Sequence, residues 1–191
     1  MKTIYYHGSN TIIQMPDLSK SREDIDFGEG FYLTEDYSMA AKWACKKNNS
    51  ICNKYNLDLD GLAVYEFVLG KEWLDFVTAN RNEEIDKNNK FEKYDILIGA
   101  IADDRLYYTI EMYENGFLPA SKAIEIMNCM DYGKQIVLKT QKAIDNLEFL
   151  GYEKISGERK YNFKEQYRNE KREAFARTEQ LIREYQNRDE G

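Results

Sequence analysis

The pattern of hydrophobic and polar positions is typical of strands in some segments and of helices in others. It therefore predicts short strands mixed with helices. Apolar and aromatic residues gather in brief runs typical of strands. We expect strands over residues 3–6, 31–34, 62–69, 94–101, 135–139 and 151–155. Apolar residues at helical spacing predict helices over residues 37–52, 106–115, 121–130, 140–150 and 164–187, with Thr34, Ser121 and Thr140 as caps of three of them.

The order of these elements predicts an α+β fold, because strands and helices follow one another without a regular βα repeat. Residues 53–61 form a polar connection, and residues 73–77 fit either a short strand or a helical turn. We expect one domain over residues 1–157 and a charged C-terminal helix over residues 158–191.

Composition narrows the class of protein. The chain is 42% hydrophobic, which is enough for a core, and it has no apolar run long enough to span a membrane. Three widely spaced cysteines and no apolar leader favour a cytoplasmic protein. With one histidine and no Cys-x-x-Cys pair, we expect no metal site.

The net charge of −7 argues against a protein that coats nucleic acid non-specifically, but the charge is unevenly distributed along the chain. Residues 159–177 hold seven basic and three acidic side chains, with aromatic residues between them. This segment is either a solvated helix face with i,i+4 ion pairs, or a guide for a nucleic-acid strand. Its narrow apolar seam is also suited to an antitoxin or another partner protein.

Gly28-Glu29-Gly30 is the most distinctive local pattern, since two glycines let the backbone turn sharply and approach another molecule. On its own, this glycine pattern predicts either a simple turn or a backbone edge that binds another molecule. His7 ends a predicted strand before Gly8, and Asp103-Asp104 follow another strand, where they fit either a ligand crevice or a helix cap. Gln135 begins a strand. No phosphate-binding P-loop and no Gly-x-Ser-x-Gly nucleophile motif is present.

Three segments together resemble the ADP-ribosyltransferase superfamily, in the branch that diphtheria toxin shares with the poly(ADP-ribose) polymerases. They are Tyr6-His7-Gly8-Ser9, Phe27-Gly28-Glu29-Gly30-Phe31-Tyr32-Leu33-Thr34 and Met39-Ala40-Ala41-Lys42-Trp43-Ala44. That branch has a strand ending in His-Gly, a Gly-x-Gly turn into a strand bearing Tyr, and an Ala-rich helix. More closely, the chain resembles a small bacterial family of that clan in which Ile-Gly-x-Ile-Ala-Asp-Asp and a Gln-Ile strand recur. The resemblance covers residues 3–150.

The resemblance implies a split β-sheet fold that holds NAD between two small sheets. The backbone of Gly8 would hold the nicotinamide carboxamide, His7 would bond a ribose hydroxyl, and Tyr32 would stack on the nicotinamide ring. The other implied cofactor contacts are the Ser9 hydroxyl, Arg22 at the pyrophosphate, and the turn of Phe27, Gly28 and Gly30.

The third catalytic position departs from the superfamily, because Gln135 stands where Glu is usual. Cleavage of the nicotinamide bond passes through an oxocarbenium-like state, for which a preorganised acceptor contributes roughly 3–4 kcal/mol. Two arrangements fit. In the first, Gln135 fills the third position, and either Asp104 or the acceptor itself supplies the base. In the second, Asp103 or Asp104 is the third residue, as in the rifampin-modifying transferases. We take Gln135 for the position and Asp104 for the chemistry.

The expected function is an NAD-dependent mono-ADP-ribosyltransferase, a bacterial toxin or defence effector that modifies a protein or a nucleic acid. Without the Glu, extension of a poly(ADP-ribose) chain is not expected. Two alternatives stay open: a catalytically weak NAD-binding or interaction module, which Gln135 favours, and an NAD glycohydrolase with water as the acceptor.

Overall fold

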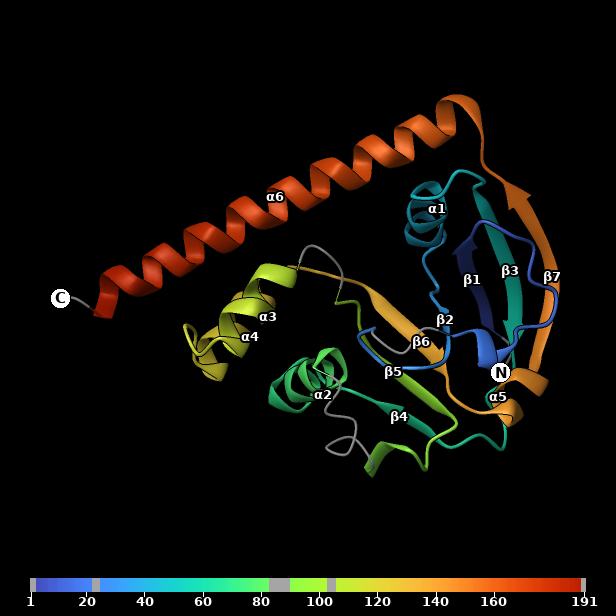
Figure 1. Cartoon of the computed structure of the whole chain (residues 1–191), viewed down its shortest axis with the longest axis horizontal. Coiled ribbons are helices and arrows are strands. Elements are labelled where there is room, and N and C mark those ends of the chain that lie inside the picture. Colours follow the sequence, from blue (N-terminus) through green and yellow to red (C-terminus); the bar gives the residue numbers. More distant parts are fainter. Residues whose placement is uncertain (1–2, 22–24, 83–89, 103–105, 190–191) are drawn as a thin grey trace.

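The computed structural model describes residues 3–21, 25–82, 90–102 and 106–189, with side chains up to residue 186. Two sheets stand side by side, with helices on their outer faces (Figure 1). This arrangement confirms the predicted α+β class. The chain also has the short helices η1 (Leu18–Lys20) and α5 (Gln141–Asp145).

The first sheet is antiparallel and has the order β1 (Thr3–Ser9), β3 (Ile51–Leu57), β7 (Leu147–Lys154). The prediction missed its central strand, since residues 37–52 were expected to be helical and residues 53–61 to be a connection. The reason is Asn53, a polar residue that is completely buried. Its amide donates to Ser9 Oγ at 3.0 Å and accepts from the Ile13 amide at 3.0 Å. Buried polar atoms are tolerated when they are hydrogen-bonded in this way.

The second sheet has the order β2 (Phe31–Leu33), β6 (Lys134–Leu138), β5 (Ile96–Ala100), β4 (Val64–Glu66). Only the β4–β5 pair is parallel in the described part of the chain. Predicted strands match β2, β5 and β6 closely, whereas β4 is shorter than the apolar run over residues 62–69. Side chains alternate between the faces of β6, so Ile136 and Leu138 face the first sheet while Val137 faces the helices.

One core lies between the two sheets and a larger one lies behind the second sheet. The first includes Tyr5, Tyr55, Leu33, Ile96 and Leu138, which are all buried. The second lies under α2 (Lys71–Arg81), α3 (Tyr107–Glu114) and α4 (Ala120–Met127). The segment left open as strand or helix is thus helical, because Trp73, Leu74 and Val77 bury one side of α2.

Helix α1 (Tyr37–Cys45) covers the outer face of the first sheet and packs directly on Gly8. A Cβ atom at Gly8 would lie 2.1 Å from the Ala40 carbonyl oxygen, so only glycine lets helix and strand approach this closely. Two predicted caps are wrong. Asp36 rather than Thr34 caps α1, and Ser121 lies inside α4, which follows Pro119. Thr140 caps its helix as predicted, accepting from the Ala143 amide.

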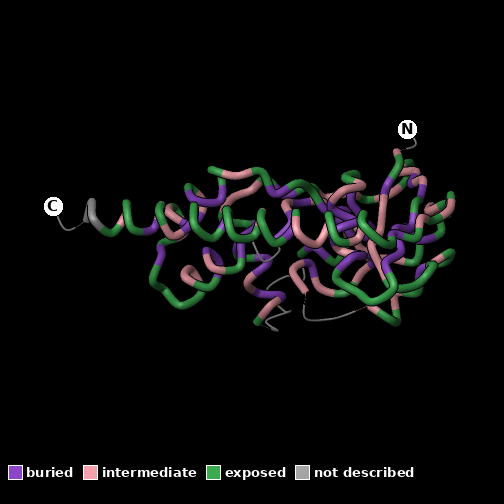
Figure 2. Tube along the Cα trace, turned by 90° about the horizontal axis from the view of Figure 1, so that it is seen from above, coloured by how far each residue is buried: buried purple, intermediate pink, exposed green. Residues whose placement is uncertain are grey.

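Helix α6 (Gly157–Asp189) runs from the end of β7 across α1 to α3 and α4 (Figure 1). Most of its positions are exposed or partly exposed, and buried ones recur at intervals (Figure 2). Lys42 of α1 is 6% exposed and donates to Glu170 of α6 at 2.7 Å. Farther along, Thr178 and Ile182 are buried. Much of the apolar seam predicted from the sequence therefore packs against the rest of the chain, including Tyr167 and Ala174, whereas Phe175 is 47% exposed.

Several basic residues at the start of α6 are engaged within the protein. Arg159 bonds Glu153 and the Tyr37 hydroxyl, and Lys160 donates to the Lys47 carbonyl oxygen at 2.9 Å. These side chains hold α6 to the first sheet. Arg159 and Lys160 are therefore not available to form part of a continuous phosphate-binding surface.

The close packing of α1 on β1 predicts that Gly8→Ala lowers the free energy of unfolding by about 1–3 kcal/mol, the usual cost of overpacking. Urea unfolding followed by circular dichroism measures this change. Gly70→Ser is the control, because a Cβ there meets nothing closer than 3.8 Å and Ser suits a helix N-cap. A Gly8→Ala variant as stable as the wild type would refute the packing argument.

Candidate functional site

The two sheets are joined by backbone hydrogen bonds between a single residue pair in the described part of the chain. The Tyr6 amide donates to the Thr34 carbonyl at 2.8 Å, and the Thr34 amide donates to the Tyr6 carbonyl at 3.0 Å. Residues two apart in a strand direct their backbone groups to the same side. The amide and carbonyl of Gly8 therefore point toward β2, and those of Tyr32 point toward β1. Gly8 and Tyr32 face each other beyond this pair, where no backbone hydrogen bond joins β1 and β2 in the described part of the chain; we call this unpaired stretch the gap.

His7 lies beside this gap. Its Nδ1 lies 2.7 Å from the Tyr32 carbonyl oxygen, and its ring stacks on Phe31 with 4.5 Å between ring centroids. A carbonyl only accepts, so Nδ1 carries the proton of the neutral ring and Nε2 is an acceptor. Burial lowers the pKa of His7, while the bond to the Tyr32 carbonyl opposes the shift. His7 is thus a neutral acceptor at pH 7.

The glycine turn is held in place by Tyr32 and Lys139. The Tyr32 hydroxyl donates to the Gly28 carbonyl at 2.7 Å and accepts from the Phe27 amide at 3.1 Å. Lys139 Nζ donates to the Phe27 carbonyl at 2.7 Å and also to the Glu29 carbonyl. Gly30 is at φ 155°, and a Cβ there would lie 2.5 Å from Val137 Cγ1. These contacts fix the turn against β6 and fix the Tyr32 ring against the turn.

Gln135 is brought to the same face of the second sheet as Tyr32. The register pairs Tyr32 with Val137, and Gln135 is two residues from Val137 on the same strand. Gln135 is 3% exposed, and its Nε2 donates to the Ala100 carbonyl at 3.4 Å. The structure thus brings His7, Gly8, Tyr32 and Gln135 around one region.

Other predicted site residues are placed differently. The Phe27 ring is completely buried among Phe67 and Phe76, so its backbone, not its ring, lies near the gap. The Ser9 hydroxyl donates to the Thr11 carbonyl at 2.5 Å and accepts from Asn53, which commits it to the loop after β1. Three predicted positions lie outside the described residues: Arg22, Asp103 and Asp104.

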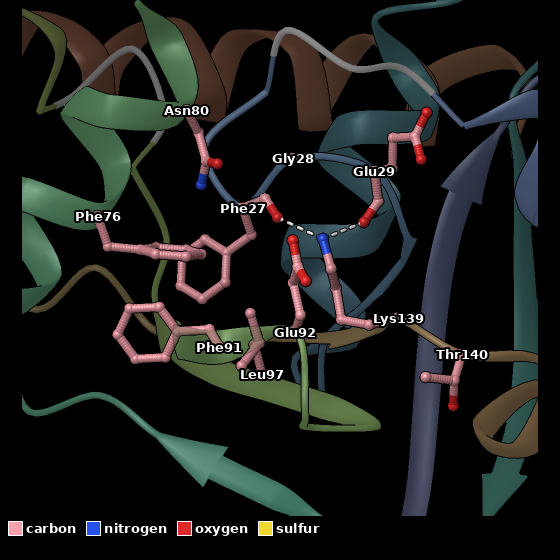
Figure 3. Close-up of a pocket in the computed structure, with 10 residues that line it drawn as sticks. All are labelled: Phe27, Gly28, Glu29, Phe76, Asn80, Phe91, Glu92, Leu97, Lys139 and Thr140. Carbon is pink, nitrogen blue, oxygen red and sulfur yellow. Dashed lines mark hydrogen bonds between the residues drawn. The ribbon is translucent and has the colours of Figure 1, made fainter. Parts of the chain in front are cut away.

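A cavity of about 520 Å³ lies on another side of the glycine turn (Figure 3). Phe27, Gly28 and Lys139 line it, whereas His7, Tyr32 and Gln135 do not. Burial lowers the pKa of Lys139 to about 8, although the negative charge of Glu29 opposes the shift. The cavity and the gap therefore share the glycine turn as a wall.

Sequence reasoning missed the residues that support the site. The strand predicted over residues 135–139 assigns Lys139 no role, although a lysine on the same face as Gln135 and Val137 is a signal of a buried cation. The prediction of Thr34 as a helix cap does not reveal that its backbone joins the sheets. Asn80 was not singled out, and its amide donates to the Asp26 carbonyl at 2.9 Å next to the turn.

Sites of two other kinds are absent from the described residues. No group of three or more His, Cys, Asp and Glu side chains there is arranged to hold a metal ion. Among the described helices, none combines the length and apolar character needed to cross a membrane.

The position of His7 predicts an imidazole pKa below the ordinary 6.5 in the folded protein. Because the folded-state pKa is the lower one, the contribution of His7 to stability is complete above pH 6.5. It is lost as pH falls through the folded-state pKa, where the unfolded chain binds more protons. NMR titration checks this directly, since His7 is the only histidine. His7→Gln should remove that part of the pH dependence of urea unfolding. A folded-state midpoint at or above 6.5 would contradict the assignment.

Comparison with known proteins adds a family but no activity. No curated protein and no solved structure matches the chain significantly. A model for a family described as proteins of unknown function, DUF3990, matches residues 3–149. The match contains His7, Tyr32 and Gln135 and ends before α6. The chain belongs to the DUF3990 family.

Proposed function

We propose that the protein is an NAD-dependent mono-ADP-ribosyltransferase whose nicotinamide site is the gap between β1 and β2. The observation that carries this proposal is the direction of the Gly8 backbone. Its amide and carbonyl point into the gap, as those of Tyr6 point to Thr34. One donor beside one acceptor complements a primary carboxamide, which presents an acceptor and a donor side by side.

The surrounding side chains suit the other parts of NAD. Nε2 of neutral His7 would accept from a ribose hydroxyl, and the ring of Tyr32 would stack on the cationic nicotinamide ring. Two hydrogen bonds tie the Tyr32 hydroxyl to the glycine turn, so the orientation of the ring is set before the ligand arrives. Such preorganisation reduces the entropic cost of reaching the reactive geometry.

The reaction breaks the bond between C1′ of the ribose and the nicotinamide nitrogen, with the electron pair leaving on nicotinamide. A nucleophile of the acceptor, a protein or a nucleic acid, then bonds C1′. With its Nε2 directed at Ala100, Gln135 offers Oε1 as an acceptor for the ribose 2′-hydroxyl. Asp104 remains a prediction for the base. Gln cannot supply the carboxylate expected for chain extension, which favours mono-ADP-ribosyl transfer.

A second candidate function is an NAD-binding or interaction module without efficient catalysis. The observation that favours it is Gln135 itself, which is buried and neutral where a carboxylate would stabilise positive charge. NAD hydrolysis with water as the acceptor uses the same site, so product analysis is what distinguishes it.

The proposal predicts release of nicotinamide when the purified protein is incubated with labelled NAD and candidate acceptors. We expect His7→Leu and Gln135→Leu each to lower kcat/KM at least about tenfold, because each removes an acceptor whose loss costs about 1.4 kcal/mol or more. Gln141→Leu is the matched control, since it makes the same change at an exposed position of α5.

The labelled products separate the alternatives. Label on protein or nucleic acid supports transfer, whereas ADP-ribose without labelled acceptor supports hydrolysis. NAD binding without nicotinamide release from any acceptor mixture would support the binding module and reject the enzyme.

A further inference from the structure

The cavity behind the glycine turn has an apolar floor over three buried aromatic residues, of which Phe27 is 0% exposed, Phe76 3% and Phe91 5%. Phe27, Phe76 and Phe91 lie around it as neighbours, with centroid distances of 5.2 Å for Phe27–Phe76 and 4.9 Å for Phe76–Phe91 (Figure 3). Leu97 completes this floor. A volume of about 520 Å³ is in the usual range for small-ligand sites. Its occupant is therefore expected to be of small-molecule size and to have an apolar part.

The polar groups that line the cavity determine which functional groups its ligand must carry. Lys139 uses two of its three N–H donors on the carbonyls of Phe27 and Glu29, which leaves one donor for a ligand acceptor. Glu92 also lines this space, whereas the carboxylate of Glu29 points away from the other labelled side chains (Figure 3). One acid, Glu92, and one ammonium group, Lys139, leave no net positive charge in the cavity to hold an anion. They favour a neutral ring that offers an amino group beside an acceptor atom.

An amino-bearing nucleobase has this combination of groups. Adenine, cytosine and guanine each carry an exocyclic amino group beside a ring nitrogen or carbonyl, and their rings supply the apolar part. An arginine side chain also pairs with carboxylates, but it has donors only and would face the Lys139 ammonium. The cavity thus suits a base better than an acceptor arginine.

The position of the cavity connects it to the proposed reaction. Phe27 and Gly28 line the cavity, and the same two residues bond the Tyr32 hydroxyl. A base in the cavity would lie one turn of chain away from the ring expected to stack on nicotinamide. We propose that this cavity recognises an amino-bearing nucleobase of a single-stranded nucleic-acid acceptor, an inference that rests on the proposed transferase function.

Recognition of this kind depends little on phosphate contacts, which agrees with the net charge of −7. Affinity should therefore fall only shallowly with salt, because few counterions are released on binding.

Binding is tested without NAD, so that it does not depend on catalysis. Short single strands are prepared with one adenine, cytosine or guanine between abasic sites, together with a fully abasic strand, and their affinities are measured by fluorescence anisotropy. We expect each strand with a base to bind at least about tenfold more tightly than the abasic strand, which corresponds to about 1.4 kcal/mol. Equal affinities would overturn the proposal.

Glu92→Gln probes the cavity without disturbing the core, because Glu92 is exposed on its rim. This variant should lose about tenfold in affinity for the base, whereas Glu111→Gln on the exposed face of α3 should not. Unchanged affinity in Glu92→Gln would overturn the assignment of the cavity, as would tighter binding of an arginine peptide that Glu92→Gln abolishes.

Competition with NAD identifies the source of the base. If saturating NAD leaves the affinity for the strand unchanged, the base belongs to the acceptor, as proposed. If NAD displaces the strand, the cavity holds the adenine of the co-substrate and the proposal fails. A protein that binds the base through Glu92 but never releases nicotinamide refutes the proposed enzyme while leaving base recognition in place.

Discussion

The candidate site depends on a single backbone pair, Tyr6 with Thr34, that joins the two sheets. Its two hydrogen bonds fix β1 beside β2 at one point. Because backbone groups alternate in direction along a strand, the same pair determines that Gly8 and Tyr32 face each other beyond it. The imidazole of His7 then bonds the Tyr32 carbonyl, an acceptor that continued strand pairing would have used.

The rest of the fold fixes the positions of β1 and β2 on either side of the gap. Helix α1 packs on Gly8 with no room for a Cβ atom, which fixes β1 from outside. Lys139 and the Tyr32 hydroxyl hold the glycine turn, which fixes β2. Helix α6 contacts α1 at one end and the helices over the second sheet at the other. It therefore connects the helix that packs on β1 with the helices that cover the second sheet.

The sequence predicted the parts of the fold that have strong local signals. The strands at β2, β5 and β6 and the stop of α3 at Gly116 follow from apolar runs and glycine, and they are confirmed. Strand β3 could not be predicted in this way, because Asn53 is polar in sequence and buried only through partners in a distant loop. Local spacing likewise did not decide between strand and helix for Trp73.

The same limit applies to the site. The pattern around His7 and Tyr32 indicated a possible pocket, and the structure brings these residues and Gln135 to one region. The cavity beside them was not predictable, because its wall combines the glycine turn, α2, the start of β5 and the end of β6. Its lysine is informative only once burial and the two backbone carbonyls around it are known.

The most direct test of this account is ¹⁵N NMR of the single imidazole during titration with NAD. The account predicts that in the free protein Nδ1 carries the proton and Nε2 does not. It further predicts that NAD shifts the Nε2 resonance in the direction of a newly accepted hydrogen bond, while Nδ1 stays bonded to the Tyr32 carbonyl. A His7 spectrum that saturating NAD leaves unchanged would contradict the proposal that the gap between β1 and β2 binds the co-substrate.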